Sequence, residues 1–271
     1  MDKRKLERII LLILALLNVF LLSVVLSDSA EDRRSARETA ASVTALLEEN
    51  GLSVSPGAVS IAEAPAPAVL TRDIAAESEK IQKLIGAYTP EDVGGNIIYY
   101  RAEKGQALLR GSGELDVMLN YGSFPLRRSQ ERTAERLLRS IGVSARPTGE
   151  GAGVDFYCCC DGIPVYNAIL SFTFSENSLT MLSGTRLFDG VSRSSGDRQL
   201  DSVSALLRFI EIVRTEGYIC SRVDSVEAGY TMTVTRSGVS ELTPVWRIVT
   251  DTGPVLIDAG TGKVVKQAWL T

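Results

Sequence analysis

The sequence of 271 residues contains no histidine and only four cysteines. Without histidine, a Ser-His-Asp triad, a Cys-His pair, a histidine-bearing zinc site and an imidazole pH switch are excluded. The cysteines are Cys158, Cys159, Cys160 and Cys220, a spacing that matches neither a disulfide framework nor the usual metal motifs. A net charge of −4 also lacks the basic excess of a dedicated nucleic-acid binder. The composition predicts no catalytic centre, no cofactor, no metal and no nucleic-acid partner.

One long apolar run is present near the start of the chain. Residues 2–8 (DKRKLER) contain four bases, and residues 9–26 (IILLILALLNVFLLSVVL) contain no charge. A helix of 18 residues is about 27 Å long, close to the roughly 30 Å of a bilayer's hydrocarbon core. Because the flank beyond Leu26 is net acidic, the positive-inside rule places residues 1–8 in the cytoplasm and residues 27–271 outside. The run predicts a retained, single-pass anchor in the cell membrane.

A cleaved signal peptide is the alternative for this run. Such a peptide has an apolar region of about 7–15 residues and an A-x-A-like cleavage site. The present run is longer, and Asp28-Ser29-Ala30 places an acid where such a site needs a small residue, although Val25-Leu26-Ser27 is an acceptable site. Within the run, Asn18 either bonds back to its own helix or forms a hydrogen bond with the helix of another protein.

The remaining residues are typical of an α+β fold in which helices lie over antiparallel strands. Residues 29–50 predict a stalk-like helix, and the proline-containing residues 53–70 predict an extended connector or edge strands. Further helices are expected at 74–85, 129–141 and 201–214. Strands are expected at 97–102, 107–110, 115–119, 168–174, 182–188, 230–236, 245–250, 255–258 and 264–268. The predicted extracellular domains are residues 27–128 and 129–271.

The C-terminal domain is predicted to be duplicated, as units 129–188 and 201–271. Each unit opens with a helix and contains a Pro-Val-aromatic step, Pro164-Val165-Tyr166 in the first and Pro244-Val245-Trp246 in the second. Units of about 70 residues are marginal alone, so the two are expected to pack on each other. The Ser- and Gly-rich residues 189–198 between them are expected to form a mobile loop.

Two motifs invite a chemical interpretation, and each has a plainer structural one. The segment Gly260-Thr261-Gly262-Lys263 lacks the Ser or Thr that a phosphate loop has after its lysine, so we predict a hairpin turn. Glu131 and Glu135 alternate with arginines, which predicts a solvated, ion-paired helix face rather than an acid–base pair.

The cysteine triplet follows Asp155-Phe156-Tyr157, just before an Asp-Gly turn. In a strand, Cys158 and Cys160 would face one way and Cys159 the other, as small apolar residues. A disulfide from one of them to Cys220, outside the cell, is an alternative. A metal site made of the four sulfurs is another.

Three stretches of the sequence resemble a known family. They are L-x-x-L-N-x-F-L-L at residues 14–22, LTPVWRI at 242–248 and LIDAGTGK at 256–263. Together with the single membrane segment and the α+β remainder, they are similar to the YycH/YycI regulators of Gram-positive bacteria, most of all to the YycI type. The two C-terminal stretches also resemble PepSY-type domains.

The resemblance implies a non-catalytic regulator beside the membrane sensor histidine kinase of a two-component system that controls cell-wall metabolism. Its implied partners are that kinase, a paralogous YycH-like protein and the lipid bilayer. Leu14, Asn18, Leu21 and Leu22 would then form part of the partner surface in the membrane. One alternative is a PepSY-like extracellular module that binds peptide or inhibits a secreted protease. An enzyme that uses carboxylates or a thiolate is a third hypothesis.

Overall fold

The computed structural model describes residues 34–126, 129–149, 151–193, 199–235 and 239–265. These residues contain four helices and a large sheet, which confirms the predicted α+β class. Across the described ranges, no helix combines the length and the apolar character needed to cross a membrane.

The predicted membrane helix, residues 9–26, lies outside the described residues. The four residues assigned to a partner surface lie outside them as well: Leu14, Asn18, Leu21 and Leu22. Their roles stay predictions.

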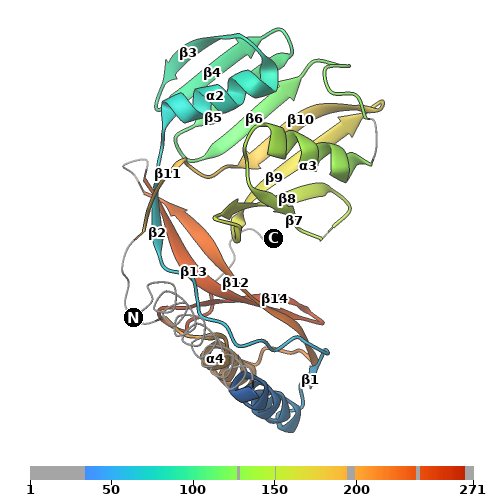
Figure 1. The fold of residues 1–271 in the computed structure, drawn as a ribbon, viewed down its shortest axis with the longest axis vertical. Coiled ribbons are helices and arrows are strands. Elements are labelled where there is room, and N and C mark those ends of the chain that lie inside the picture. The colour runs from blue at the N-terminus through green and yellow to red at the C-terminus, as the bar shows by residue number, and fades with distance from the viewer. Residues whose placement is uncertain (1–33, 127–128, 150, 194–198, 236–238, 266–271) are drawn as a thin grey trace, which may run out of the picture.

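Fourteen strands of the described chain join in one continuous sheet, with the order β11-β2-β13-β12-β9-β10-β6-β5-β4-β3 along its main path (Figure 1). Beside this path, β1 pairs with β12, β14 with β13, and β8 with both β7 and β9. The strands are β1 (Ser53–Val54), β2 (Ala68–Thr71), β3 (Tyr88–Gly94), β4 (Ile97–Ala102), β5 (Gly105–Arg110), β6 (Glu114–Leu119), β7 (Ala145–Pro147), β8 (Val154–Cys160), β9 (Ile163–Ser175), β10 (Ser178–Thr185), β11 (Gly190–Arg193), β12 (Arg222–Val234), β13 (Val239–Thr250) and β14 (Gly253–Asp258).

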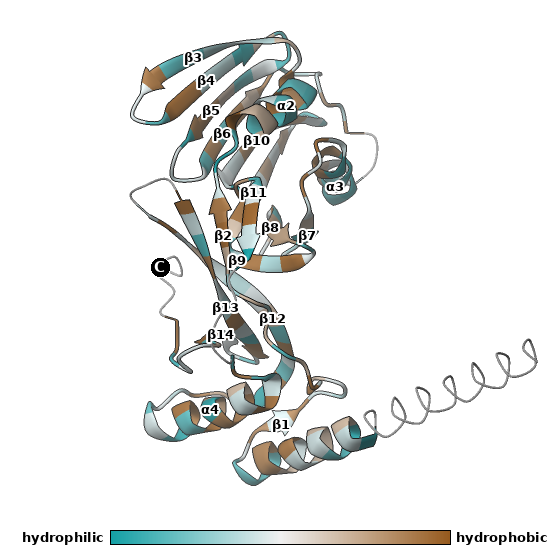
Figure 2. Ribbon diagram, turned by 60° about the vertical axis from the view of Figure 1, so that its left-hand side comes forward, coloured by the Kyte–Doolittle hydropathy of each residue, from teal (hydrophilic) through white to brown (hydrophobic). Residues whose placement is uncertain are grey.

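The molecule has two halves, and each half contains two of the four described helices. In the upper half, α2 (Ile74–Ile85) and α3 (Gln130–Ser140) lie on the same face of strands β3 to β10 (Figure 2). In the lower half, α4 (Ser202–Thr215) and the helix of residues 34–49 pack against β12, β13 and β14. Each half has its own large core cluster of buried apolar side chains.

Local signals in the sequence set the ends of α2. The carboxylate of Asp73 accepts hydrogen bonds from the backbone N–H groups of Ala75 and Ala76, which otherwise have no partner in the helix. Gly86 ends the helix with φ at 95°, a conformation that favours glycine. The observed span therefore equals the predicted one, and α3 and α4 begin in the same way, after Ser129 and Asp201.

The helix of residues 34–49 is more than the predicted stalk. Its predicted apolar face is confirmed, because Ala36 and Ala40 are half-buried and Val43 and Leu47 are buried. Val43 and Leu47 belong to the lower core cluster, together with Phe209 of α4. The C-terminal part of this helix is therefore an integral part of the lower half.

Residues 189–198 were expected to form a loop throughout, and this is wrong for its first part. Gly190–Arg193 forms β11, which pairs antiparallel with β2, a strand about 120 residues earlier in the chain. Strand β11 is too short for its sequence to show the alternation typical of a strand, and its partner lies too far away in the chain to be recognised. The strand predicted over 182–188 also ends sooner, because β10 stops at Thr185.

The sheet shows how the segments of the two predicted domains are distributed. Strand β6, before residue 128, pairs with β10, which lies in the first predicted C-terminal unit. The helix-then-strands order of that unit and of the second also occurs in α2 followed by β3 to β6. The first unit therefore shares its sheet with the N-terminal segment.

The two halves join where β9 meets β12. Tyr230 of β12 pairs in parallel with Val165 of β9 and antiparallel with Pro244 of β13. The two Pro-Val-aromatic steps therefore lie on the two strands on either side of Tyr230. The side-chain amide of Asn167 donates to the carbonyl of Met232 and accepts from its N–H, both at 2.7 Å. The Asn167 side chain thus extends the backbone pairing between the halves by one step.

Gly229 permits the close approach at this junction. A Cβ atom there would lie 2.3 Å from Cε2 of Tyr166 and 2.9 Å from the carbonyl oxygen of Pro164. Gly229→Ala should therefore lower the free energy of unfolding by about 1–3 kcal/mol, measured by urea titration. The control is Gly260→Ala, where the nearest atom to the new Cβ is 3.4 Å away and the change should stay below about 0.5 kcal/mol. Equal stability of the two variants would contradict the close-approach argument.

Candidate functional site

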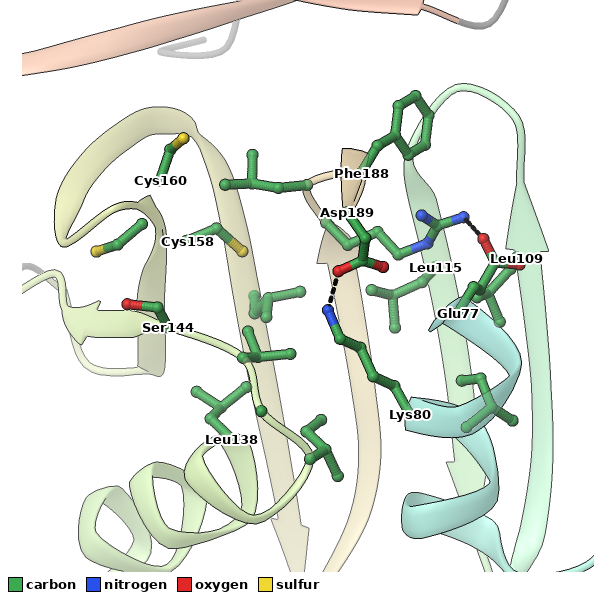
Figure 3. Close-up of a pocket in the computed structure, with 18 of the residues that line it drawn as sticks. Glu77, Lys80, Leu109, Leu115, Leu138, Ser144, Cys158, Cys160, Phe188 and Asp189 are labelled. Atoms are coloured by element: carbon green, nitrogen blue, oxygen red, sulfur yellow. Dashed lines mark hydrogen bonds and ion pairs between the residues drawn. The ribbon is translucent and has the colours of Figure 1, made fainter. Parts of the chain in front are cut away.

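A pocket of about 280 Å³ lies between α2 and α3, over a part of the sheet that neither helix covers (Figure 3). Its floor comes from the strands of the upper half and its walls from the two helices. The end near β2 and β11 is formed by the segment after β10, residues 186–189. The apolar lining consists of Leu70, Ile81, Leu84, Leu109, Leu115, Val117, Leu138, Ile141, Val143, Leu170, Leu182, Leu187, Phe188 and Val191.

The periodicity of the elements explains why this lining is apolar. Ile81 and Leu84 are three residues apart on α2 and therefore share one helix face. Leu115 and Val117 are two residues apart on β6, so both point to the same side of the sheet. The pocket is thus bounded by the faces that the sequence makes apolar for the core, at a place where the helices are too far apart to close over them.

A buried carboxylate holds one end of the pocket. Glu77 of α2 is only 3% exposed. Arg72 donates to its two oxygens at 2.7 and 2.9 Å, Arg186 donates to Oε2 at 2.5 Å, and the hydroxyl of Tyr100 donates to Oε1 at 3.3 Å. With one carboxylate between two guanidinium groups, this cluster carries a net positive charge.

The surroundings of these groups shift their pKa values. The hydrogen bonds that Arg72 donates to Glu77 raise the pKa of Arg72, while burial lowers the pKa of Arg186. Burial also raises the pKa of Tyr100, so its hydroxyl stays protonated and acts as a donor. The two guanidinium groups and the hydroxyl of Tyr100 therefore all act as hydrogen-bond donors to the carboxylate near neutral pH.

A second ion pair lies beside this cluster. The ammonium group of Lys80, one helical turn after Glu77, pairs with the carboxylate of Asp189 (Figure 3). The guanidinium of Arg186 stacks over the ring of Phe188 at 5.2 Å from its centroid. Among the described residues, the buried Nε of Arg186 has no hydrogen-bond partner. This end of the pocket therefore has unused donor capacity.

The cysteine triplet contributes to the opposite side of the pocket. Cys158 and Cys160 are buried in the upper core and Cys159 is half-buried, as the predicted alternation requires. Burial raises the pKa of Cys158 to about 12 and also raises the pKa values of Cys159 and Cys160. Near neutral pH these groups are thiols, which are weak nucleophiles and weak metal ligands.

The alternatives considered for the cysteines find no support in the structure. All four are free thiols, and Cys220 packs against the lower core whereas Cys158 and Cys160 belong to the upper one. The disulfide to Cys220 is therefore absent. Within the described ranges, no group of three or more cysteine and acidic side chains is arranged to hold a metal ion.

The segment Gly260–Lys263 is the predicted turn. The carboxylate of Asp258 accepts from the backbone N–H groups of Gly260 at 2.9 Å and of Thr261 at 2.7 Å, and Gly262 has φ at 68°. A phosphate loop directs such N–H groups to its ligand, whereas here the chain's own carboxylate occupies them. The phosphate-loop interpretation is thereby excluded.

The acidic residues of α3 form the predicted solvated face. Glu135 pairs with Arg139 at 2.8 Å, and their side chains are 48% and 78% exposed. Exposed pairs one turn apart contribute a few tenths of a kcal/mol to helix stability, about 0.3–0.5 kcal/mol. This arrangement does not resemble a buried acid–base pair.

The sequence analysis missed the charged end of the pocket. Glu77 lies between Ile74 and Ile81 on the apolar face predicted for α2, and a charged residue on such a face is a signal of a buried partner. Its partner Arg186 is 109 residues away, however, and no spacing rule connects the two.

Comparisons with known proteins show no family for this chain. No family model matches it, and no curated protein matches it. A crystal structure of an uncharacterized protein from Eubacterium rectale aligns with 11% identity and a TM-score of 0.49 over 80% of this chain and 90% of that one. The structure of YycH from Bacillus subtilis aligns with 12% identity and a TM-score of 0.41 over 76% of this chain and 56% of that one. The function must be argued from the chain's own residues.

Replacement of Glu77 tests the buried cluster. Glu77→Gln should lower the free energy of unfolding by about 3–5 kcal/mol, because two guanidinium groups lose the charge that compensates their burial. The matched control is Glu79→Gln on the same helix, whose exposed pair with Lys83 is screened by solvent, so that the free energy of unfolding should stay close to that of the wild type. An equal loss of unfolding free energy for both variants in urea titrations would show that the buried cluster stabilises the fold no more than an exposed ion pair does.

The raised pKa of Cys158 predicts a loss of stability at alkaline pH. The folded pKa of about 12 exceeds the ordinary value of 9.0, so this stabilisation is complete below pH 9.0 and lost as the pH rises toward 12. Between pH 8 and about pH 10.5, unfolding of the wild type should become easier by roughly 2 kcal/mol more than unfolding of Cys158→Val. Parallel pH profiles of the two proteins in urea titrations would contradict this assignment.

Proposed function

We propose that this chain is a membrane-anchored regulatory protein that acts by binding, not by catalysis. Its partner in this proposal is the sensor histidine kinase of a two-component system related to the cell wall. In this proposal residues 1–8 are cytoplasmic, residues 9–26 span the membrane, and the two α+β halves are extracellular. A paralogous YycH-like protein is a second partner.

The observation that carries this proposal is the packing of the helix of residues 34–49. Seven residues separate its first described turn from Leu26, the end of the predicted membrane segment. Val43 and Leu47 fix the helix in the lower core. A segment that only tethered an outer domain would need no such integration, whereas a regulator needs its membrane and outer parts to move together.

The sequence supplies the remaining support. Asn18 places an amide midway along a run that contains no charge, where a hydrogen bond to another helix is favourable. The resemblance to YycH/YycI regulators covers this run as well as residues 242–248 and 256–263, which form parts of β13 and of β14 with the turn after it. These two strands form the sheet on which α4 packs.

A second candidate function is favoured by the pocket between α2 and α3. An extracellular binding module of the PepSY-like type, which binds peptide or inhibits a secreted protease, requires a recessed apolar site and no particular membrane helix. Replacement of residues 9–26 by an unrelated membrane helix separates the two candidates. Kinase regulation is lost on this exchange if the first is correct, and the activity of a binding module is kept.

Co-purification from detergent-solubilised membranes tests the kinase partner. The wild type should carry a histidine kinase with it, identified by mass spectrometry. Asn18→Leu should reduce the recovered kinase about 3- to 30-fold, because an interhelical hydrogen bond contributes about 0.6–2 kcal/mol. Ser23→Leu, a second polar replacement in the same run, is the control for altered hydrophobicity, and recovery of the variants from the membrane fraction controls for insertion. Absence of a kinase from the wild-type preparation would refute the proposal.

A further inference from the structure

The pocket between α2 and α3 has the properties of a site for a small ligand. Its volume of about 280 Å³ is close to the lower end of ligand pockets, about 300–1,000 Å³. Water is a poor occupant for most of this space, since an ordered water needs two to four polar partners and the lining is mainly apolar. The body of a fitting ligand is therefore apolar and small.

The hydrogen-bonding capacity at the charged end selects the head group of the ligand. Both oxygens of Glu77 already accept from arginine, so this carboxylate has little left to offer a cation. By contrast, the buried Nε–H of Arg186 has no partner among the described residues. The ammonium of Lys80 has three donors, and Asp189 supplies an acceptor for it. Unused donors predominate here, and they require an acceptor.

The net charge of the same groups favours an anionic acceptor. In the lining, Glu77 and Asp189 oppose Lys80 and Arg186, and Arg72 pairs with Glu77 from outside the lining, which leaves one positive charge at this end of a mainly apolar cavity. Asp161 also lines the pocket, and its charge is compensated by its ion pair with Arg193. A carboxylate would supply that charge and would form charge-assisted hydrogen bonds with guanidinium and ammonium donors. The Lys80–Asp189 pair is only partly buried, with side chains 30% and 24% exposed, so the lysine can exchange its partner.

We propose that this pocket binds a free monocarboxylic acid with a medium-length apolar chain, its carboxylate held by Lys80 and Arg186. The chain then lies along the apolar floor between the helices, toward Cys158. The acyl chains of phospholipids do not fit this requirement, because their carboxyl groups are esterified. The proposal is independent of the kinase partner, since it concerns residues of the upper half alone.

Binding of decanoate to the full chain in phospholipid nanodiscs tests the proposal, with empty nanodiscs as the blank and radiolabelled ligand in equilibrium dialysis. Decanoate should bind about tenfold more tightly than octanoate, because the two additional methylene groups are buried. Decan-1-ol, which has the same chain without the charge, should bind about tenfold more weakly than decanoate. This comparison uses the wild type and needs no variant.

The two partners of the ion pair should shift the affinity for decanoate in opposite directions. Lys80→Met removes a ligand for the carboxylate and should raise Kd about tenfold. Asp189→Asn removes the carboxylate that competes with the ligand for the ammonium of Lys80, and should lower Kd by about threefold. If Lys80 and Asp189 only stabilised the fold, both replacements would weaken the binding of decanoate. The control is Lys83→Met on the same helix, whose pair with Glu79 lies outside the pocket and whose Kd should be unchanged.

Three results would overturn the proposal. The first is no decanoate binding above that of empty nanodiscs. The second is equal affinity for decanoate and decan-1-ol, or shifts in the same direction for Lys80→Met and Asp189→Asn. The third is binding of the peptide acetyl-Leu-Leu without binding of decanoate, which would identify a peptide site instead. None of these results bears on co-purification with a kinase.

Discussion

The burial of one carboxylate constrains the whole upper half. At 3% exposure, Glu77 needs cationic partners, because an unpaired charge in the core costs several kcal/mol. It finds them in Arg72, before α2, and in Arg186, after β10. These contacts tie the helix to two segments far apart in the sequence. They also fix the segment that carries Asp189, and with it the charged end of the pocket.

The pocket follows from this arrangement together with the spacing of the helices. Helix α2 is held by its charged cluster, and α3 is held farther along the same face by Ala134, Leu137 and Leu138. Side chains of both helices line the recess between them, among them Ile81 and Leu84 of α2 and Leu138 of α3. The result is an apolar recess with a charged end in the upper half, while Val43 and Leu47 pack the helix of residues 34–49 into the lower core.

The predictable parts of the fold are those whose causes lie close together in the sequence. The span of α2 is fixed by Asp73 and Gly86 at its ends, and the turn at 260–263 by Asp258, so both were predicted correctly. Strand β11 and the contact of Glu77 with Arg186 depend on residues more than a hundred positions away, and they were missed. The cysteines show the same difference. The alternation of Cys158, Cys159 and Cys160 follows from the strand itself and was predicted, whereas the placement of Cys220 against the other core cluster depends on the whole fold and was not.

The pairing of β1 with β12 has a consequence for biosynthesis. Ser53 meets the strand at Arg222, and the hydroxyl of Ser53 bonds across 168 positions of the chain. Strands β3 to β10, by contrast, are all complete before residue 186. A ribosome therefore finishes the upper half while the apolar face around Val43 and Leu47 still waits for α4 and β12. The first described segment to be translated is among the last to be packed.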